Sequence, residues 1–147
     1  MSDGILQVAL AAPLDTLFDY LPPADRAAAS IAPGTRVRVP FGRRQTCGLV
    51  MGVAAVSTLA PERLRRVSLV LDDAPLLDTQ DLALLRWAAA YYHHPIGEVV
   101  LAALPARLRR GEPALQHGVP AWRLTAAGRA VTLDSLRRAP RQRALLA

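Results

Sequence analysis

Apolar and polar side chains alternate over several short stretches in the first half of the chain, a pattern typical of strands with one buried face. The alternation predicts five strands, at residues 5–11, 17–21, 36–39, 46–56 and 65–71. Pro22 and Pro23 end the second strand, because proline lacks the amide hydrogen that strand pairing requires. We expect a short helical segment within residues 24–30.

Glycines mark where these strands turn or bend. Gly42 lies within residues 41–45, which we expect to connect the third and fourth strands as a hairpin. Gly48 and Gly52 fall inside the fourth strand and predict a bulge or bend of the kind found in small closed sheets.

A helical spacing of apolar residues replaces the alternation after Asp78, which is a suitable N-cap. The apolar positions that follow fall on one helical face: Leu82, Leu85, Ala89 and Tyr92. Pro95 closes this helix, and residues 96–104 predict a second one. The predicted fold class of residues 1–105 is therefore α+β, with a small antiparallel sheet or barrel followed by two helices.

The remaining residues, 106–147, predict a linker and an incomplete second unit. Proline, glycine and arginine are mixed between residues 105 and 120, as in linkers. Residues 121–125 predict a strand, and a helix with Pro140 at its first position follows. So few large apolar side chains make a poor independent core.

Charge is distributed unevenly along the chain. The 147 residues include 18 basic ones, all arginine, against 12 acids, for a net charge of +6. Residues 36–66 hold seven arginines and one acid, net +6, and residues 106–147 hold nine arginines and two acids, net +7. Basic clusters of this kind indicate a polyanion partner, most often nucleic acid, or alternatively a solvated surface in an arginine-rich proteome.

Several classes of protein are disfavoured by composition. Without lysine the chain has no Walker A phosphate loop, and with Cys47 as the single cysteine it has no disulfide framework or multi-cysteine zinc site. His93 and His94 diverge by about 100° on a helix, so we expect them not to share a metal ion. We instead expect Tyr91, Tyr92 and His93 to pack against the sheet. No segment resembles a signal peptide or a membrane span, which predicts a soluble cytoplasmic protein.

Phe18-Asp19-Tyr20 has two interpretations. In the first, both aromatic rings fill the core, on the opposite face of the strand from Asp19, which caps a turn. In the second, the triplet forms a pocket for one base and one hydroxyl. Aromatic rings stack on any base, and a carboxylate accepts a hydrogen bond from a free 3′-hydroxyl while repelling the phosphate of a continuing strand.

Two groups of arginines accompany the predicted strands. Gly42 would let a ligand approach the hairpin backbone, and Arg43 and Arg44 follow it. The second group is Arg63, Arg65 and Arg66. Both groups are candidates for phosphate contacts, or else ordinary solvated loop charge.

With these motifs in place, the sequence resembles the N-terminal part of the PriA family of bacterial replication-restart helicases. The most specific segments are Arg-Val-Arg-Val-Pro-Phe-Gly at residues 36–42 and Tyr-Tyr-His-His-Pro-Ile-Gly at residues 91–97. Shorter matches run in the same order along essentially the whole chain, at residues 8–13, 18–21, 48–50, 69–72, 103–105 and 109–111.

The resemblance implies that residues 1–105 bind the 3′ end of a nascent strand at a stalled fork. The implied site consists of Phe18, Asp19, Tyr20, Gly42 and Arg65. Arg65 stands where the family usually has lysine, which keeps the charge and changes its geometry. Residues 106–147 would begin a winged-helix domain.

For a full-length parent, the resemblance implies an ATP-dependent 3′–5′ DNA helicase that uses ATP, magnesium and zinc. It also implies a helicase core, other primosome proteins and single-stranded-DNA-binding protein as partners. For this chain alone we expect DNA as the partner, and neither a cofactor nor enzymatic activity. The alternative hypothesis is a protein-interaction scaffold that packs on a helicase core or on acidic partners.

Overall fold

The computed structural model describes residues 4–114 and 123–146. The chain divides into two compact units, Met1–Ala114 and Leu115–Ala147. The first therefore continues past residue 105, where the sequence analysis places the end of the first domain. Within the described residues, no helix is both long and apolar enough to cross a membrane.

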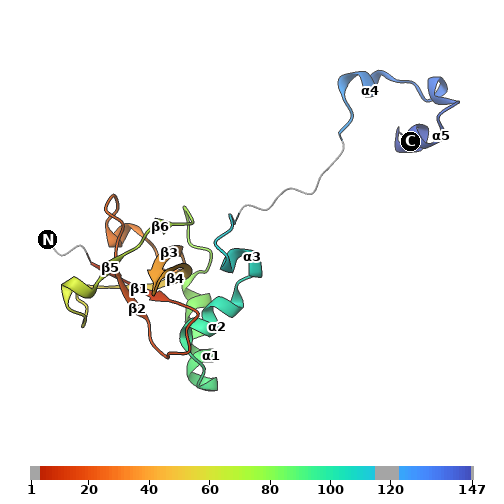
Figure 1. Ribbon diagram of the computed structural model, residues 1–147. Helices are drawn as coiled ribbons and strands as arrows, with labels where there is room; N and C mark the ends of the chain where they lie inside the picture. The colour runs from red at the N-terminus through yellow and green to blue at the C-terminus, as the bar shows by residue number, and fades with distance from the viewer. Residues whose placement is uncertain (1–3, 115–122, 147) are drawn as a thin grey trace. The chain divides into compact units, whose positions relative to one another are not determined.

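The first unit is built on one curled, six-stranded sheet, seen in Figure 1. The strands lie in the order β5-β2-β1-β4-β3-β6. Their bounds are β1 Ile5–Ala9, β2 Phe18–Leu21, β3 Arg36–Phe41, β4 Arg44–Ala54, β5 Arg65–Arg66 and β6 Leu69–Val70. Helices follow the sheet, so the predicted α+β class is confirmed.

The two edges of the sheet are joined by consecutive residues. Val67 and Ser68 connect the edge strands β5 and β6: the amide of Val67 donates to the carbonyl of Leu21 in β2 at 2.9 Å, and the amide of Ser68 donates to that of Arg38 in β3 at 2.8 Å. The prediction of a single strand over residues 65–71 is wrong, because the chain crosses from β5 to β6 here. The side chain of Val67, 3% exposed, fills the core at the crossing.

The hairpin and the bulge predicted from glycines are confirmed. Gly42 and Arg43 connect β3 to β4 in a two-residue turn, with Phe41 opposite Arg44. Between β1 and β4 the register shifts from Gln7 opposite Gly52 to Val8 opposite Val50, which leaves Met51 as the extra residue. The short helical segment predicted within residues 24–30 is a 3-10 turn, η1, at Ala28–Ser30.

The sheet has a hydrophobic core on each face. The inner core contains buried residues from every long strand: Leu6, Val8, Leu10, Tyr20, Ala28, Ile31, Val37, Val39, Val50 and Val67. On the outer face, Ala9, Leu49 and Met51 pack against α1 (Thr79–Tyr92) and α2 (Ile96–Ala103). These two helices lie together below the sheet in Figure 1.

Helix α1 begins as the sequence predicts. Asp78 Oδ1 accepts hydrogen bonds from the amides of Gln80 and Asp81 at 2.8 and 2.9 Å. Asp81 Oδ2 accepts one in return from the amide of Asp78 at 3.1 Å, which completes a capping box. Leu82 and Ala89 are buried, as expected for the apolar face.

The end of α1 differs from the prediction. Tyr91 and Tyr92 are 64% and 69% exposed, and His93 is exposed as well, so the expected packing against the sheet is wrong. Tyr91 follows Leu82 by nine residues, which places it on the opposite helical face at 3.6 residues per turn. There Tyr91 stacks on Trp87, with the ring centroids 5.0 Å apart.

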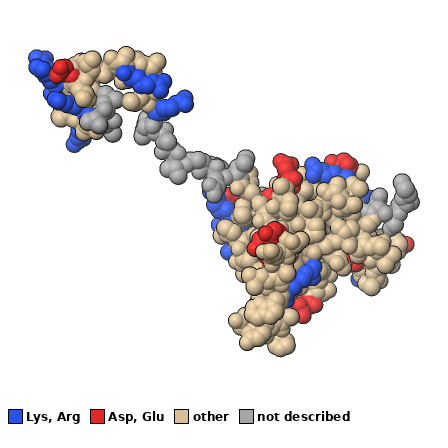
Figure 2. Space-filling view, turned by 180° about the vertical axis from the view of Figure 1, so that it is seen from behind, with Lys and Arg blue, Asp and Glu red and all other residues tan. Residues whose placement is uncertain are grey.

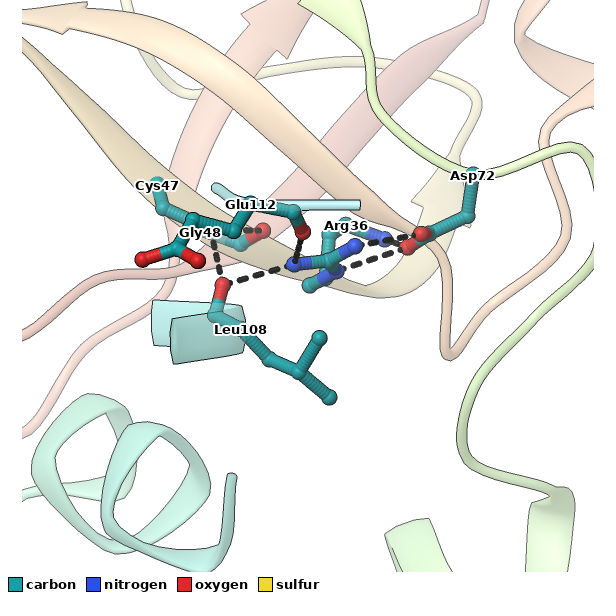
Figure 3. A network of polar contacts seen from close by, with 6 residues as sticks. All are labelled: Arg36, Cys47, Gly48, Asp72, Leu108 and Glu112. Carbon is teal, nitrogen blue, oxygen red and sulfur yellow. Dashed lines mark hydrogen bonds and ion pairs between the residues drawn. The ribbon is translucent and has the colours of Figure 1, made fainter. Parts of the chain in front are cut away.

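A buried arginine holds the end of the first unit against the sheet (Figure 3). Arg36 is fully buried and donates from Nε and Nη2 to the two carboxylate oxygens of Asp72, at 2.9 and 2.7 Å. Its Nη1 donates to the carbonyl oxygens of Leu108 and Glu112, at 2.7 and 2.9 Å. The start of the expected linker therefore forms α3 (Ala106–Arg109), bound to the sheet.

The second unit contains α4 (Ala126–Ala130), a 3-10 turn η3 (Leu133–Leu136) and α5 (Pro140–Leu146). Helix α5 begins at Pro140 as predicted. Of the strand predicted at residues 121–125, the first two residues lie outside the described ranges. The other three form no strand, because Thr125 N-caps α4 and its Oγ1 accepts from the amide of Gly128 at 3.1 Å. Whether this unit begins a winged-helix domain stays a prediction.

We predict that Arg36→Met lowers the free energy of unfolding of the first unit by about 3–5 kcal/mol, because it removes four side-chain hydrogen bonds and leaves the buried Asp72 carboxylate without its cationic partner. Urea denaturation followed by circular dichroism measures the loss. The matched control is Arg107→Met, since the Arg107 side chain is 65% exposed in its ion pair with Glu112. The control should cost less than about 1 kcal/mol. Equal losses in the two variants would contradict the prediction.

Candidate nucleic-acid interface

A cavity of about 620 Å³ opens beside β2 and the tip of the β3–β4 hairpin. The segment between β4 and β5 forms its remaining wall. The cavity is lined by residues of these parts, of the end of the loop before β2 and of β5: Thr16, Leu17, Phe18, Asp19, Tyr20, Pro40, Phe41, Gly42, Thr58, Leu59, Glu62, Arg63 and Arg65. All five residues of the site implied by the resemblance are among them, although they span nearly fifty positions of the sequence.

The register of β2 explains how its aromatic residues are placed. Phe18 lies opposite Val8 and Tyr20 opposite Leu6, whose side chains belong to the inner core, and Asp19 lies opposite Gln7 between them. The predicted alternation is confirmed. Phe18 packs edge-to-face on Phe41 across the cavity wall, with the ring centroids 5.2 Å apart. Both rings keep part of their surface accessible.

Tyr20 supports the cavity from the core side. It is 4% exposed, and its hydroxyl donates to the carbonyl oxygen of Pro40 at 2.9 Å, which ties β2 to the hairpin. Burial raises the pKa of Tyr20, and the nearby Arg65 partly opposes this. Tyr20 therefore satisfies the core interpretation while still lining the cavity.

The Asp19 carboxylate is half-buried and has one oxygen engaged. Its Oδ2 accepts a hydrogen bond from Ser57 Oγ at 2.6 Å. Its Oδ1 accepts none from the part of the chain that the structure describes. An acceptor of this kind is available to a hydroxyl in the cavity.

Gly42 and Arg65 meet at the hairpin tip. Gly42 has a φ of 59°, a conformation that favours glycine, and the space where a Cβ would stand is open, with no atom within 4 Å. Arg65 lies opposite Tyr20 in the pairing of β5 with β2, and its Nη1 donates to the Gly42 carbonyl oxygen at 3.3 Å. A ligand in the cavity can approach the hairpin backbone closely and meet a guanidinium there.

The other four arginines named in the sequence analysis are placed differently from one another. Arg63 lines the cavity. Arg43 and Arg44 are exposed at the hairpin tip and do not line it. Arg66 donates from Nη1 to the carbonyl oxygen of Pro22, the residue after β2, at 2.9 Å, and it does not line the cavity.

Sequence reasoning did not identify Glu62 or Ser57. Glu62 lies in a 3-10 turn, η2, at Pro61–Arg63, and lines the cavity. Glu62 is the only acid among the seven arginines of residues 36–66, and this isolated position could have marked it as a candidate site residue. Nothing in the sequence pattern distinguishes Ser57, because its contact with Asp19 depends on how the segment after β4 folds.

The cavity combines both signs of charge. Asp19 and Glu62 supply two carboxylates, and Arg63 and Arg65 two guanidinium groups. Figure 2 likewise shows red and blue patches interspersed over the first unit, with no continuous basic surface on that face. Such a site fits a ligand that presents a neutral hydroxyl and a phosphate at different points.

Comparison with known proteins places the first unit in a class and then in a family. Residues 7–105 match the family described as the PriA 3′ DNA-binding domain, so this unit is a DNA-binding domain. The chain belongs to that PriA family, which confirms the resemblance stated from the sequence motifs.

The relatives include three proteins called replication restart protein PriA. That of Haemophilus influenzae is 39% identical over 139 residues, which cover 94% of this chain and 19% of the relative. That of Treponema pallidum is 32% identical over 108 residues, covering 71% and 16% of the two chains. That of Buchnera aphidicola is 27% identical over 108 residues, covering 72% and 14%. The chain thus spans no more than about a fifth of these relatives.

We predict that Tyr20→Phe lowers the free energy of unfolding by about 1 kcal/mol at pH 7, because the Pro40 carbonyl loses its donor. The difference from the wild type should narrow as the pH rises above 10.0, the ordinary tyrosine pKa. Because folding raises the pKa of Tyr20, the unfolded chain loses that proton first, and the stability present at lower pH is lost through the alkaline range.

Urea denaturation at pH 7, 9 and 11 tests this, in a chain without lysines that would titrate there. Tyr92→Phe is the control, since Tyr92 is 69% exposed. If the free energies of unfolding of Tyr20→Phe and the wild type differ by the same amount at all three pH values, the raised pKa of Tyr20 in the folded chain is contradicted.

Proposed function

We propose that the first unit binds the free 3′ end of a DNA strand, with little preference for the terminal base, and that it does so in replication restart. The observation that carries this proposal is that Asp19 keeps an acceptor oxygen in the same cavity as aromatic rings and guanidinium groups. The 3′-end preference and the base tolerance go beyond the DNA binding that family membership establishes.

The carboxylates supply the selection for an end. Asp19 Oδ1 accepts the hydrogen of a 3′-hydroxyl, whereas a 3′-phosphate or a continuing strand brings negative charge toward Asp19 and Glu62. Both carboxylates line the same cavity, so a phosphate meets repulsion from two groups. The site therefore distinguishes a terminus from the interior of a strand.

The remaining groups bind without reading sequence. The accessible surfaces of Phe18 and Phe41 offer a base an aromatic contact, which is worth about 1–3 kcal/mol for any base. The open space at Gly42 allows the terminal nucleotide to approach the backbone. Arg65 and Arg63 then meet the preceding phosphates, and Arg43 and Arg44 extend the positive charge along the hairpin tip.

The wider role belongs to a longer protein. The relatives are named for replication restart, and by resemblance such a parent acts as a helicase at stalled forks with ATP, magnesium and zinc. The helicase core, other primosome proteins and single-stranded-DNA-binding protein remain predicted partners. The second unit remains the predicted start of a winged-helix domain.

A second candidate function, a protein-interaction scaffold, is favoured by the exposed face of α1. Leu84, Trp87 and Tyr91 are 60%, 56% and 64% exposed there. A chain that binds no forked DNA at moderate salt would favour this candidate over the first.

We predict that the wild-type chain binds an oligonucleotide with a 3′-hydroxyl about ten- to a hundredfold more tightly than the same strand with a 3′-phosphate, as expected for a hydrogen bond to a charged group. Asp19→Ala should bring the two affinities together. Fluorescence anisotropy with a 5′-labelled strand measures both. Asp25→Ala, an exposed acid outside the cavity lining, is the control and should keep the preference. Equal wild-type affinities for the two ends would falsify the proposal.

We predict that Arg43→Ala reduces the slope of log affinity against log salt concentration by about 0.7, the value for one phosphate contact on a single strand. The ratio of 3′-hydroxyl to 3′-phosphate affinity should not change, because Arg43 does not line the cavity. Titrations at several salt concentrations give the slope, and Arg26→Ala, exposed and outside the cavity, serves as the control. An unchanged slope would show that Arg43 does not contact a DNA phosphate.

A further inference from the structure

Ser57 lies three residues after the end of β4, at the start of the segment that forms one wall of the cavity. Its side chain is half-buried and does not line the cavity itself. Instead, its hydroxyl contacts Asp19 Oδ2 at 2.6 Å and the amide of Leu59 at 3.0 Å. Asp19 and Leu59 both line the cavity, so one hydroxyl links two parts of its lining.

The direction of these two hydrogen bonds is fixed by their partners. The Leu59 amide can only donate, so Ser57 Oγ accepts from it. An ionised carboxylate can only accept, so the single hydroxyl hydrogen of Ser57 is donated to Asp19 Oδ2. The contact therefore engages one oxygen of Asp19 and leaves Oδ1 to accept from a ligand.

We propose that Ser57 is the positioning residue for strand-end recognition: it holds the Asp19 carboxylate in the orientation that accepts the 3′-hydroxyl and fastens the Leu59 wall to it. This inference rests on the proposed 3′-end function and assigns to it a residue that touches Asp19 without touching DNA. A carboxylate that is already held loses less freedom when the strand end binds.

An opposite role is also testable. If the Ser57 hydroxyl occupied the place that the DNA hydroxyl takes, the strand end would have to displace it, and removing it would tighten binding. The second bond, from the Leu59 amide, favours positioning, because displacement would break two hydrogen bonds and release the wall as well.

The test compares Ser57→Ala with Ser57→Thr by anisotropy on strands ending in a 3′-hydroxyl or a 3′-phosphate. We expect Ser57→Ala to weaken binding of the 3′-hydroxyl strand about three- to tenfold, the usual effect of ordering one side chain, and to leave the 3′-phosphate strand unchanged. Ser57→Thr keeps the hydroxyl and should restore the preference. In an Asp19→Ala background, Ser57→Ala should have no further effect.

Ser68→Ala is the matched control. Ser68 Oγ also donates to a side-chain oxygen, Gln45 Oε1 at 3.0 Å, and neither residue lines the cavity. It should leave both affinities unchanged. The midpoint of thermal unfolding, measured for each variant, should stay within a few degrees of the wild type.

The outcomes separate this inference from the proposed function. If the wild type prefers a 3′-hydroxyl and Asp19→Ala abolishes that preference while Ser57→Ala retains it, the positioning role is wrong and the proposed function stands. Tighter binding by Ser57→Ala, or equal weakening for both strand ends, also overturns the positioning role. If the wild type has no end preference, the proposed function itself fails. If Ser57→Ala does not fold, Ser57→Thr decides: a Ser57→Thr chain that has lost the preference for a 3′-hydroxyl overturns the positioning role, and one that keeps this preference supports it.

Discussion

The crossing at Val67 and Ser68 is the constraint on which the candidate site depends. Their consecutive amides bond to β2 and β3, the strands next to the two edges, so the sheet curls until the edge strands β5 and β6 are joined by these two residues. This closure puts β5 beside β2 and sets Arg65 opposite Tyr20. Only then does the Arg65 guanidinium reach the Gly42 carbonyl at the hairpin tip. A flat sheet with the same strands would separate these groups.

Features set by neighbouring residues could be predicted from the sequence, and features set by distant contacts could not. The capping box at Asp78 and the turn at Gly42 depend on a few adjacent residues, and both are confirmed. The division of residues 65–71 into two strands depends on which edge each half meets. The exposure of Tyr91 depends on which face of α1 the sheet covers. The position of α3 against the sheet depends on the buried guanidinium of Arg36, about seventy residues earlier in the chain.

The candidate site shows the same limit more sharply. From the residues alone, Phe18-Asp19-Tyr20 allowed either a core or a pocket, and the resemblance supplied the remaining members. In the structure each interpretation holds for a different residue. Tyr20 is buried in the core, while Asp19 has one carboxylate oxygen available to a ligand in the cavity. Ser57 was not predictable, because no periodicity or motif records where the chain folds back after β4.

The bonds from Arg36 to Leu108 and Glu112 also set the reach of whatever follows the first unit. The segment that leaves the first unit is free of the sheet only after Glu112, not after Pro105. Each residue held against the sheet shortens the maximum length of this segment by about 3.5 Å. A shorter tether raises the effective concentration of one binding module at the site of the other. A guanidinium buried for reasons of packing thus also limits how far the segment beyond Glu112 can extend from the first unit.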